Sequence, residues 1–301
     1  MTKKDRGYRY FLLISPFIVL VFLFAYFPLH GWIYSFYDYR PALGMAGSEF
    51  VGLRWFNMLF RNPAQLRELW RVLRNTFAMS FLTLSTSILP MFMAILLNEM
   101  RSKRFKKSVQ ILTTLPNFIS WVLIYSMAFM LFSHGGMVNT MLQNLGITDV
   151  AIRFLDTNRF TWLQMLGWGL WRGLGWGTII YLAAISGIDQ ELYEAARVDG
   201  AGRFQLMRHI TFPGLLPTFL VLFLLGVANL LNNGMEQFFV FQNAFNRANI
   251  EVLDLYIFNI GIASGNLSLG TAISMLRSVV SVTLLFSVNF IAKKIRGEGI
   301  I

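Results

Sequence analysis

Long apolar segments without charged side chains alternate with short polar segments along the chain. No Asp, Glu, Lys or Arg occurs from Tyr10 to Leu29, from Asn75 to Asn98 or from Ser108 to Ser133. A helix needs about 20 such residues to cross the hydrocarbon core of a bilayer, so the pattern predicts membrane-spanning helices. The six predicted spans are residues 10–30, 75–98, 108–132, 160–185, 212–235 and 270–292.

Two other segments are predicted to be helical without crossing the membrane. Residues 64–74 repeat apolar side chains at helical spacing, which is typical of an amphipathic helix at a membrane surface. Residues 255–269 are apolar but interrupted by Gly and Asn, and we expect a helix or re-entrant piece at the outer surface, with a seventh span as the alternative. The pattern therefore predicts an all-α integral membrane protein with one transmembrane domain over residues 1–301.

The composition excludes a soluble enzyme. Of the 301 residues 55% are hydrophobic and 14% are charged, whereas a typical soluble domain is about 25% charged. The net charge of +11 suggests nucleic acid, but the aromatic residues lie inside apolar runs and no polar basic face is present, so we expect no nucleic-acid partner. The basic residues instead flank spans, where they set orientation and meet anionic lipid headgroups. The absence of Cys rules out disulfides and thiolate metal sites.

The distribution of Lys and Arg predicts that both termini are cytoplasmic. Residues 99–107 carry five Lys or Arg residues, while the longer segment 236–269 carries only Arg247. Basic residues concentrate in short cytoplasmic loops, so 99–107 is expected inside and 236–269 outside. The first outer loop fits this rule poorly, because it holds several arginines. They are Arg40, Arg54, Arg61, Arg67, Arg71 and Arg74.

No constellation for catalysis or metal binding is present in the sequence. The phosphate-loop pattern GxxxxGK[ST] is missing, and the three histidines have no ligand-type partner at helical spacing. No carboxylate lies deep in the predicted spans, where a proton- or sodium-coupled carrier commonly places one. An ion-gradient-driven carrier or channel and an integral-membrane transferase are the alternatives to a transport subunit that is driven by another protein.

The predicted cytoplasmic loop at 189–209 has the pattern of a short helix–turn–helix. Asp189 is a good N-cap for a helix over 190–198, and Asp199–Gly200 ends it, because Gly accepts the positive φ of a helix end. A second helix is predicted over 201–210. The residues alone leave two interpretations of this loop, a docking surface for a partner and an amphipathic connector packed on its own spans.

This loop resembles the EAA motif of the membrane subunits of ATP-binding-cassette importers. The matching positions are Glu194, Ala195, Ala196, Asp199, Gly200, Ala201, Ile210, Pro213 and Pro217. Met207 and Phe212 depart from the usual Phe and Leu but keep an apolar side chain. The resemblance implies that the loop is the coupling helix, which docks into a groove on a separate ATPase through the first six matching residues. Glu194 and Gly200 are expected to matter most.

Further blocks resemble the branch of this family that imports complex oligosaccharides. They lie at residues 75–76, 97–99, 115–121, 135–139, 236–238 and 289–299. The resemblance implies the permease fold of type I importers in a bacterial cell membrane, with this chain forming half of the translocation path. It implies as partners a second, similar permease, a cytoplasmic ATPase dimer that binds ATP and Mg²⁺, a periplasmic or extracellular binding protein, and an oligosaccharide. No cofactor is expected on this chain.

Polar residues in or beside three predicted spans are candidates for the substrate path. They are Trp168, Arg172 and Trp176 in the fourth, Asn229, Asn233, Glu236 and Gln237 at the outer end of the fifth, and Ser274, Arg277 and Ser278 in the sixth. Arg172 is expected between the two indole rings, facing a wet cavity or a partner, and indoles also stack well on sugars. The alternatives are a packing arginine bonded to backbone carbonyls and ordinary interfacial polar groups. Two intramembrane arginines also suggest an anionic cargo, such as uronate-containing oligosaccharides.

Overall fold

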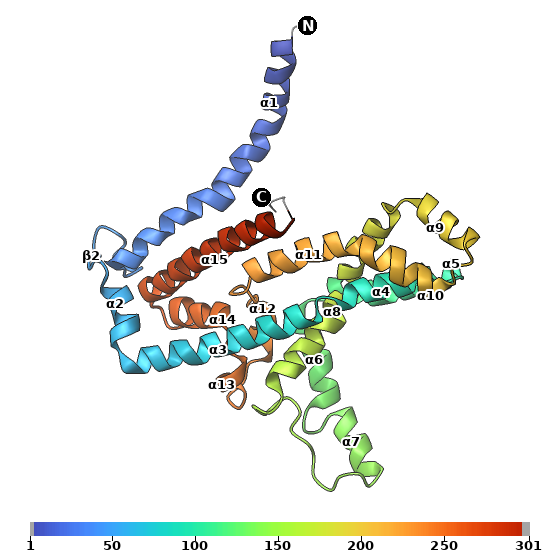
Figure 1. Cartoon of the computed structure of the whole chain (residues 1–301). Helices are drawn as coiled ribbons and strands as arrows, with labels where there is room; N and C mark the ends of the chain where they lie inside the picture. Colours follow the sequence, from blue (N-terminus) through green and yellow to red (C-terminus); the bar gives the residue numbers. More distant parts are fainter. Residues whose placement is uncertain (1–2, 297–301) are drawn as a thin grey trace. The chain divides into compact units, whose positions relative to one another are not determined.

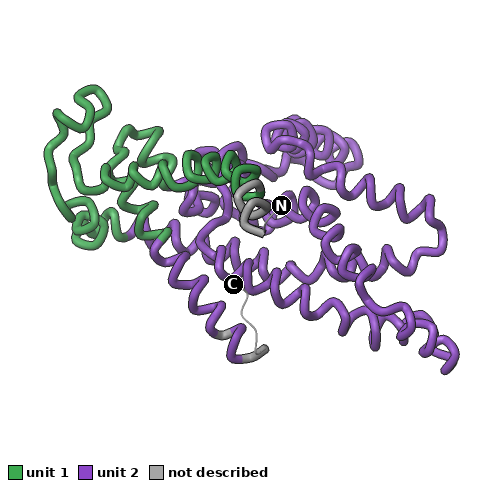
Figure 2. The backbone as a smooth tube through the Cα atoms, turned by 90° about the horizontal axis from the view of Figure 1, so that it is seen from above, with its two compact units in different colours: residues 1–66, 257–278 green, residues 67–256, 279–301 purple. Residues whose placement is uncertain are grey.

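The computed structural model describes residues 3–296, whose regular secondary structure is helical except for one short pair of strands (Figure 1). The chain divides into two compact units, residues 1–66 with 257–278 and residues 67–256 with 279–301 (Figure 2). Three helices contribute residues to both units. They are α3 (Pro63–Thr86), α14 (Leu253–Phe258) and α15 (Leu267–Arg296).

Unit 1 contains the N-terminal helices and a short pair of strands. Its elements are α1 (Lys3–Val21), the π-helical turn η1 (Phe22–Tyr26), the 3-10 helix η2 (Phe27–Phe36), β1 (Tyr37–Asp38), β2 (Glu49–Phe50), α2 (Arg54–Arg61) and the π-helical turn η5 (Asn259–Ala263). The strands are antiparallel, with Tyr37 opposite Phe50 and Asp38 opposite Glu49. This two-residue pair is a local departure from the predicted all-helical structure.

Hydrogen bonds hold the N-terminal part of unit 1 together and join it to the start of α15. Trp55 Nε1 donates to Tyr37 O (2.9 Å), which holds α2 against β1. The Tyr39 N–H donates to Ser268 Oγ (2.9 Å) at the start of α15. The apolar side chains of α1 and η1 are by contrast exposed, with Phe24 at 78%. A surface of this kind suits lipid or another helix, as expected for a first span.

Unit 2 is built around the long helix α8 (Thr161–Ser186), which packs against α4, α5 and α11. The other elements between α3 and α14 are α4 (Leu89–Asn98), α5 (Lys103–Thr114), the 3-10 turn η3 (Leu115–Phe118), α6 (Trp121–Phe132), α7 (Met137–Asn144), α9 (Gln190–Val198), α10 (Arg203–Leu206), the π-helical turn η4 (Met207–Thr211), α11 (Phe212–Ala228), α12 (Glu236–Phe241) and α13 (Arg247–Ile250). Unit 2 thus contains five of the six predicted spans in whole or in part.

Two predicted spans are interrupted at prolines, which cannot donate a backbone hydrogen bond. The second predicted span runs through the end of α3 and through α4, and the helix is broken just before Pro90. The third comprises α5 and α6, with η3 and its Pro116 between them. Ser120 then caps α6, because its side chain accepts a hydrogen bond from the Leu123 N–H.

Five stretches of the described chain are long and apolar enough to cross a membrane. They are Tyr10–Phe36, Pro63–Asn98, Trp121–Asn144, Arg203–Ala228 and Leu267–Lys294. Helix α8, which coincides with the predicted fourth span, is not among these five. Its 26 residues are sufficient in length at about 1.5 Å each, but it contains Arg172 and many glycines. The division of the chain into six spans therefore stays a prediction.

Three predicted boundaries differ from the structure. The expected surface helix at 64–74 is the first part of α3, because neither Gly nor Pro follows in the sequence before Thr86. The segment 255–269 holds most of α14, η5 and the start of α15, and its apolar helical stretch is shorter than the five above. The fifth predicted span ends early, since α11 stops at Ala228 and residues 229–235 are not helical.

Two apolar cores stabilise unit 2, and α8 contributes to both of them. The first contains Met79, Ile124, Ala128, Leu155, Met165, Phe238, Phe241, Ile250, Val252 and Leu255. The second contains Met91, Ala94, Ile95, Tyr181, Ile185 and Leu215. Because the N-terminal half of α8 lies in one core and its C-terminal half in the other, this helix connects the two ends of the unit.

The contact between α8 and α5 is close enough to require glycine. Gly175 is buried, and a Cβ at this position would overlap the backbone of Thr113 and Thr114. Backbone atoms cannot move aside as a flexible side chain can. The two helices are therefore held at the separation that the absence of a side chain permits.

Replacing Gly175 with Ala is expected to lower the free energy of unfolding by about 2 kcal/mol or more, because the added methyl group overpacks the α5–α8 contact. Gly173→Ala is the matched control, since a Cβ there meets no atom within 4 Å and Ala has the higher helix propensity. Thermal unfolding of the two purified variants in detergent measures the difference. Equal unfolding midpoints would contradict the close contact.

Candidate functional site

The loop at residues 189–209 is called the EAA loop below. Its first helix forms over the predicted residues and is capped at both ends. The side chain of Asp189 accepts a hydrogen bond from the Glu191 N–H (3.0 Å) at the start of α9. At the other end the Ala201 N–H donates to Ala196 O (2.9 Å), as in a Schellman motif. Gly200 has a φ of +82°, which few other residues adopt. The sharp turn after α9 thus depends on this glycine.

Helix α9 buries one face against its own unit and leaves the opposite face open. Tyr193 is buried, and its hydroxyl lies 2.9 Å from Thr211 Oγ1 in η4. Among the residues that match the EAA motif, Glu194, Ala195, Asp199 and Gly200 are exposed and Ala196 and Ala201 are half-buried. Val198 is 88% exposed. An apolar and acidic surface of this kind is available to a partner.

The second half of the EAA loop differs from the predicted separate helix over 201–210. Helix α10 begins at Arg203 and continues through η4 into α11, giving one helical run as far as Ala228. Arg203 also donates to Glu99 O (3.1 Å) at the end of α4 and lies 3.9 Å from the Glu99 carboxylate. The loop therefore lies beside the ends of α4 and α11, as Figure 1 shows.

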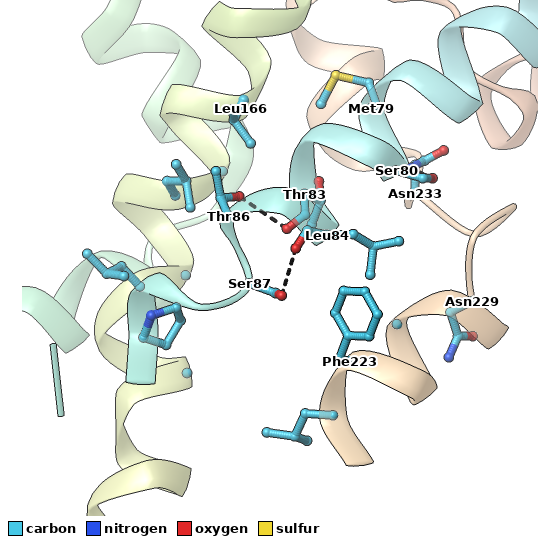
Figure 3. Close-up of a pocket in the computed structure, with 18 of the residues that line it drawn as sticks. Met79, Ser80, Thr83, Leu84, Thr86, Ser87, Leu166, Phe223, Asn229 and Asn233 are labelled. Carbon is cyan, nitrogen blue, oxygen red and sulfur yellow. Dashed lines mark hydrogen bonds between the residues drawn. The ribbon is translucent and has the colours of Figure 1, made fainter. Parts of the chain in front are cut away.

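A cavity of about 500 Å³ lies within unit 2, between α3, α4, α8 and α11 (Figure 3). Glycines of α8 and α11 leave room for it, and Met79, Leu84 and Phe223 form apolar parts of its wall. The glycines are Gly169, Gly173, Gly177 and Gly226. Its hydroxyl and amide lining includes Ser80, Thr83, Thr86, Ser87, Asn229, Asn232, Asn233 and Gln237. The residues that line it carry no charged side chain within the described chain.

Amide groups gather at the end of the cavity next to α12. Asn233 Nδ2 donates to Ser80 Oγ (2.8 Å), whose hydroxyl donates in turn to Leu230 O. Gln237 Nε2 donates to Met165 O (2.6 Å). Asn233 Oδ1 is buried and has no hydrogen-bond partner among the described residues. Asn229 and Asn232, which also line the cavity, are exposed, so their amide groups are the ones at this end that a hydroxyl group of a ligand can reach.

The predicted path residues are distributed over different parts of the structure. Asn229 lines the cavity together with Asn233 and Gln237, whereas the exposed Glu236 does not. Ser274, Arg277 and Ser278 belong to unit 1 and are half-buried. The Ser278 hydroxyl donates to the backbone of its own helix, as Ser often does in membrane helices. A role of Glu236, Ser274, Arg277 and Ser278 in the path stays a prediction.

Helix α8 turns its glycine face to the cavity and Arg172 to its other side. Arg172 Nε donates to Ile119 O (3.2 Å), and the guanidinium lies 4.8 Å from the ring centre of Trp121. Trp168 and Trp176 do not sandwich it as expected but pack against other aromatic rings. These are the contacts of a packing arginine bonded to a backbone carbonyl, the alternative interpretation. The proposed role of the three residues in the path stays untested.

A buried carboxylate outside the predicted site organises a polar cluster in unit 2. Glu251 is 0% exposed, and its Oε2 lies 2.6 Å from the guanidinium of Arg71 and 3.5 Å from that of Arg247. Arg71 also pairs with Glu68 (2.6 Å). Arg71, one of the arginines whose place in an outer loop does not fit the positive-inside rule, is thus a structural counter-ion. No sequence spacing reveals a pair whose members are so far apart in the chain.

Neighbouring polar residues extend this cluster to α8. Asn75 Nδ2 donates to Ala248 O (3.0 Å), and Arg74 donates to Asn249 Oδ1 (2.8 Å). The guanidinium of Arg74 lies 5.5 Å from the ring centre of Trp162 at the start of α8. The segment before α14 is therefore bound to both α3 and α8 by polar contacts.

Tyr256 lies next to the same cluster and contributes no charge to it. Burial raises the pKa of its hydroxyl to about 12, and the negative charges of Glu68 and Glu251 act in the same direction. The hydroxyl therefore stays protonated at neutral pH.

The sequence matches the family model of the binding-protein-dependent transport system inner membrane component over residues 86–297, more than two thirds of the chain. The chain belongs to this family. The matched region includes the EAA loop, α8 and α11.

Individual relatives of this permease are similar along nearly the whole chain. It is 38% identical over 302 residues to Protein LplB of Bacillus subtilis (strain 168), covering 100% of this chain and 93% of that protein. It is 39% identical over 292 residues to the polygalacturonan/rhamnogalacturonan transport system permease protein YteP of the same organism, covering 96% and 89%. Its fold is similar to that of a bacterial alginate ABC transporter in complex with alginate pentasaccharide-bound periplasmic protein (TM-score 0.84, 28% identity, coverage 98% and 97%).

These similarities confirm the predicted family, fold class and type of function. The chain is the permease subunit of a binding-protein-dependent importer, with the helical type I permease fold, in the inner membrane. The family consists of transport subunits, which excludes the enzyme, carrier and channel alternatives. Among the described residues no group of three or more His, Cys, Asp or Glu side chains is placed to hold a metal ion.

In this permease, Arg71→Ala is expected to lower the free energy of unfolding by about 3 kcal/mol, because it leaves a buried carboxylate without its closest counter-ion. Arg247→Ala is the control and is expected to cost less than about 1 kcal/mol, since Arg247 is 62% exposed. Denaturant unfolding in detergent measures both values. Adding Glu251→Gln to Arg71→Ala is expected to recover most of the loss, and no recovery would contradict the assigned ion pair.

Proposed function

We propose that this permease carries oligosaccharides, forms half of the translocation path, and is driven by a separate cytoplasmic ATPase that docks on the EAA loop. A second, similar permease forms the other half of the path, and a periplasmic or extracellular binding protein delivers the cargo. ATP and Mg²⁺ bind to the ATPase dimer. Both termini are cytoplasmic in this proposal, although residues 1–2 and 297–301 lie outside the described chain.

The cavity in unit 2 carries the proposal. Its volume of about 500 Å³ falls within the range of about 300–1,000 Å³ that is usual for small-molecule sites. Apolar walls suit the C–H faces of sugar rings, and hydroxyl and amide groups suit their hydroxyls. The exposed amide groups of Asn229 and Asn232 can both donate hydrogen bonds to sugar hydroxyls and accept them.

The relatives support a carbohydrate cargo. YteP is named for polygalacturonan and rhamnogalacturonan, and the similar solved transporter for alginate. The lining of the cavity is uncharged, and Arg172 is bonded on the opposite side of α8. This part of the path therefore recognises hydroxyl groups and does not select for the charge of the cargo.

Contacts of the EAA loop support a mechanical connection between the ATPase and the cavity. The Tyr193–Thr211 hydrogen bond joins α9 to the helical run that begins at Arg203. The same run carries Phe223 and Gly226, which line the cavity. A displacement of α9 by the ATPase is thereby transmitted to the cavity wall, as alternating access requires.

Glu194→Ala and Gly200→Ala are each expected to weaken ATPase docking about tenfold or more, because one removes a central exposed contact and the other strains the turn that presents α9. The readout is substrate-stimulated ATP hydrolysis after reconstitution with candidate ATPase, second permease and binding protein. Gly146→Ala is the matched control, since Gly146 also has a positive φ (+68°) but lies in the loop after α7. Unchanged stimulation in the first two variants would refute the coupling role.

Asn233→Leu keeps the side-chain size but removes the amide, and it is expected to reduce oligosaccharide uptake about tenfold, because it breaks the hydrogen bond to Ser80 that positions the amide-rich end of the cavity. Neutral and acidic oligosaccharides should be affected equally. Asn144→Leu, at the exposed end of α7, is the control. Parental uptake by Asn233→Leu would contradict the cavity as part of the path, and a loss confined to acidic cargo would contradict recognition through hydroxyls.

A further inference from the structure

A cluster of basic side chains at the start of α5 adjoins an apolar groove. Lys103, Arg104 and Lys107 are exposed. The groove has a volume of about 370 Å³ and runs between α5 and α8, with Lys107 at one end and with Ile111 and Ile179 on its two sides. It lies apart from the cavity of the proposed path, whose lining shares no residue with it.

The basic cluster is unfavourable for α5 itself. The N-terminus of a helix carries a partial positive charge, so cations in the first turn are destabilising. The first turn of α5 contains Lys103, Arg104 and Lys106 and no acidic residue. The N-cap Ser102 offsets part of this charge, because its side chain accepts a hydrogen bond from the Phe105 N–H. An external anion at this point would offset the repulsion.

The contact of the EAA loop with α4 places the cluster at one end of the unit. Glu99, which Arg203 contacts, stands only four positions before Lys103. The cluster therefore lies at the same end of the helices as the EAA loop (Figure 1). If the EAA loop is cytoplasmic, as the proposed function holds, the cluster faces the cytoplasmic leaflet.

The length of the groove fits one lipid chain. Phe118 also lines it, and at about 1.5 Å per residue in α5 and about 2.0 Å in the 3-10 turn η3 this position lies roughly 18 Å from Lys107. Half of a hydrocarbon core of about 30 Å is close to that length. A phosphate held at Lys107 would thus place an acyl chain along Ile111 and Leu115 toward the middle of the bilayer, where the groove ends.

We propose that this groove and the basic cluster bind an anionic phospholipid of the cytoplasmic leaflet. The lysines neutralise the phosphate and the positive end of α5 attracts it. The apolar walls hold one acyl chain. This inference rests on the proposed function in one respect, namely that the basic cluster lies on the cytoplasmic side of the membrane.

Binding is tested with the full-length chain purified in detergent and titrated with dioleoylphosphatidylglycerol or with dioleoylphosphatidylcholine. The anionic lipid is expected to raise the thermal unfolding midpoint, and the zwitterionic lipid is not. Lys103→Gln with Lys107→Gln is expected to weaken binding about 25-fold, at about fivefold for each lysine. The matched control is Lys293→Gln with Lys294→Gln, which changes an exposed basic pair on α15. Equal weakening by both pairs would overturn a specific site.

The groove is tested by filling it. Ile111→Trp is expected to abolish the stabilisation by phosphatidylglycerol, whereas Leu112→Trp, at a neighbouring exposed position outside the groove, is expected to retain it. Inorganic phosphate should give no shift, because it lacks the acyl chain. A shift with phosphate equal to that with lipid would overturn the proposal. Displacement of the lipid when the second permease assembles would also overturn it, since the groove would then belong to the subunit interface.

The outcome is separable from that of the proposed function. Glu194→Ala is expected to lose ATPase coupling but to keep the full stabilisation by phosphatidylglycerol. Loss of the stabilisation by phosphatidylglycerol in this variant would contradict a lipid site that is independent of the EAA loop. If the variant keeps both ATPase coupling and the stabilisation, the result contradicts the coupling role and leaves the lipid site standing.

Discussion

The backbone contact between α8 and α5 at Gly175 is the constraint on which the arrangement of unit 2 depends. Because main chain meets main chain there, α8 can neither turn about its axis nor move toward α5 without overlap. Its orientation decides what each face does. The glycines at 169, 173 and 177 leave an open space beside α3 and α11, and Arg172 lies against Trp121 on the other side. The cavity thus owes its space to the three glycines on the face of α8 that lines it.

Polar contacts hold the amide-rich end of the cavity in place. Glu251 and its arginines join α3 to the segment before α14, and Asp254 accepts a hydrogen bond from the Gly234 N–H (3.0 Å) within the non-helical residues after α11. Within that stretch Leu231 is buried and Met235 packs against the first apolar core. Apolar packing and hydrogen bonds together fix its path, and the hydrogen bond between Asn233 and Ser80 holds the amide-rich end against α3.

Local features of this protein could be predicted from the sequence, whereas the long-range pairings could not. The helix over 190–198 depends on a cap and a glycine turn, both encoded by adjacent residues. In α8 the sequence predicts the stripe of Trp and Arg as the lining of the path, whereas the stripe of glycines lines the cavity, and the packing of α8 against α5 and α6 decides which stripe faces it. The partnership of Arg71 with Glu251 has no local signal at all. Asn229, Asn233 and Gln237 line the cavity because the chain leaves α11 close to it, and their role in the path stays a prediction.

The π-helical turn η4 sets the rotational phase between the EAA loop and the cavity. Such a turn holds one residue more than the α-helical turn it replaces, and each residue of an α-helix advances the direction of its side chain by about 100°. Without the extra residue, everything after Thr211 would be rotated by that angle relative to α10. Phe223 and Gly226 would then no longer line the cavity, even if every residue that matches the EAA motif were kept. The number of residues between the start of the motif and its prolines therefore fixes which side chains of α11 face the cavity.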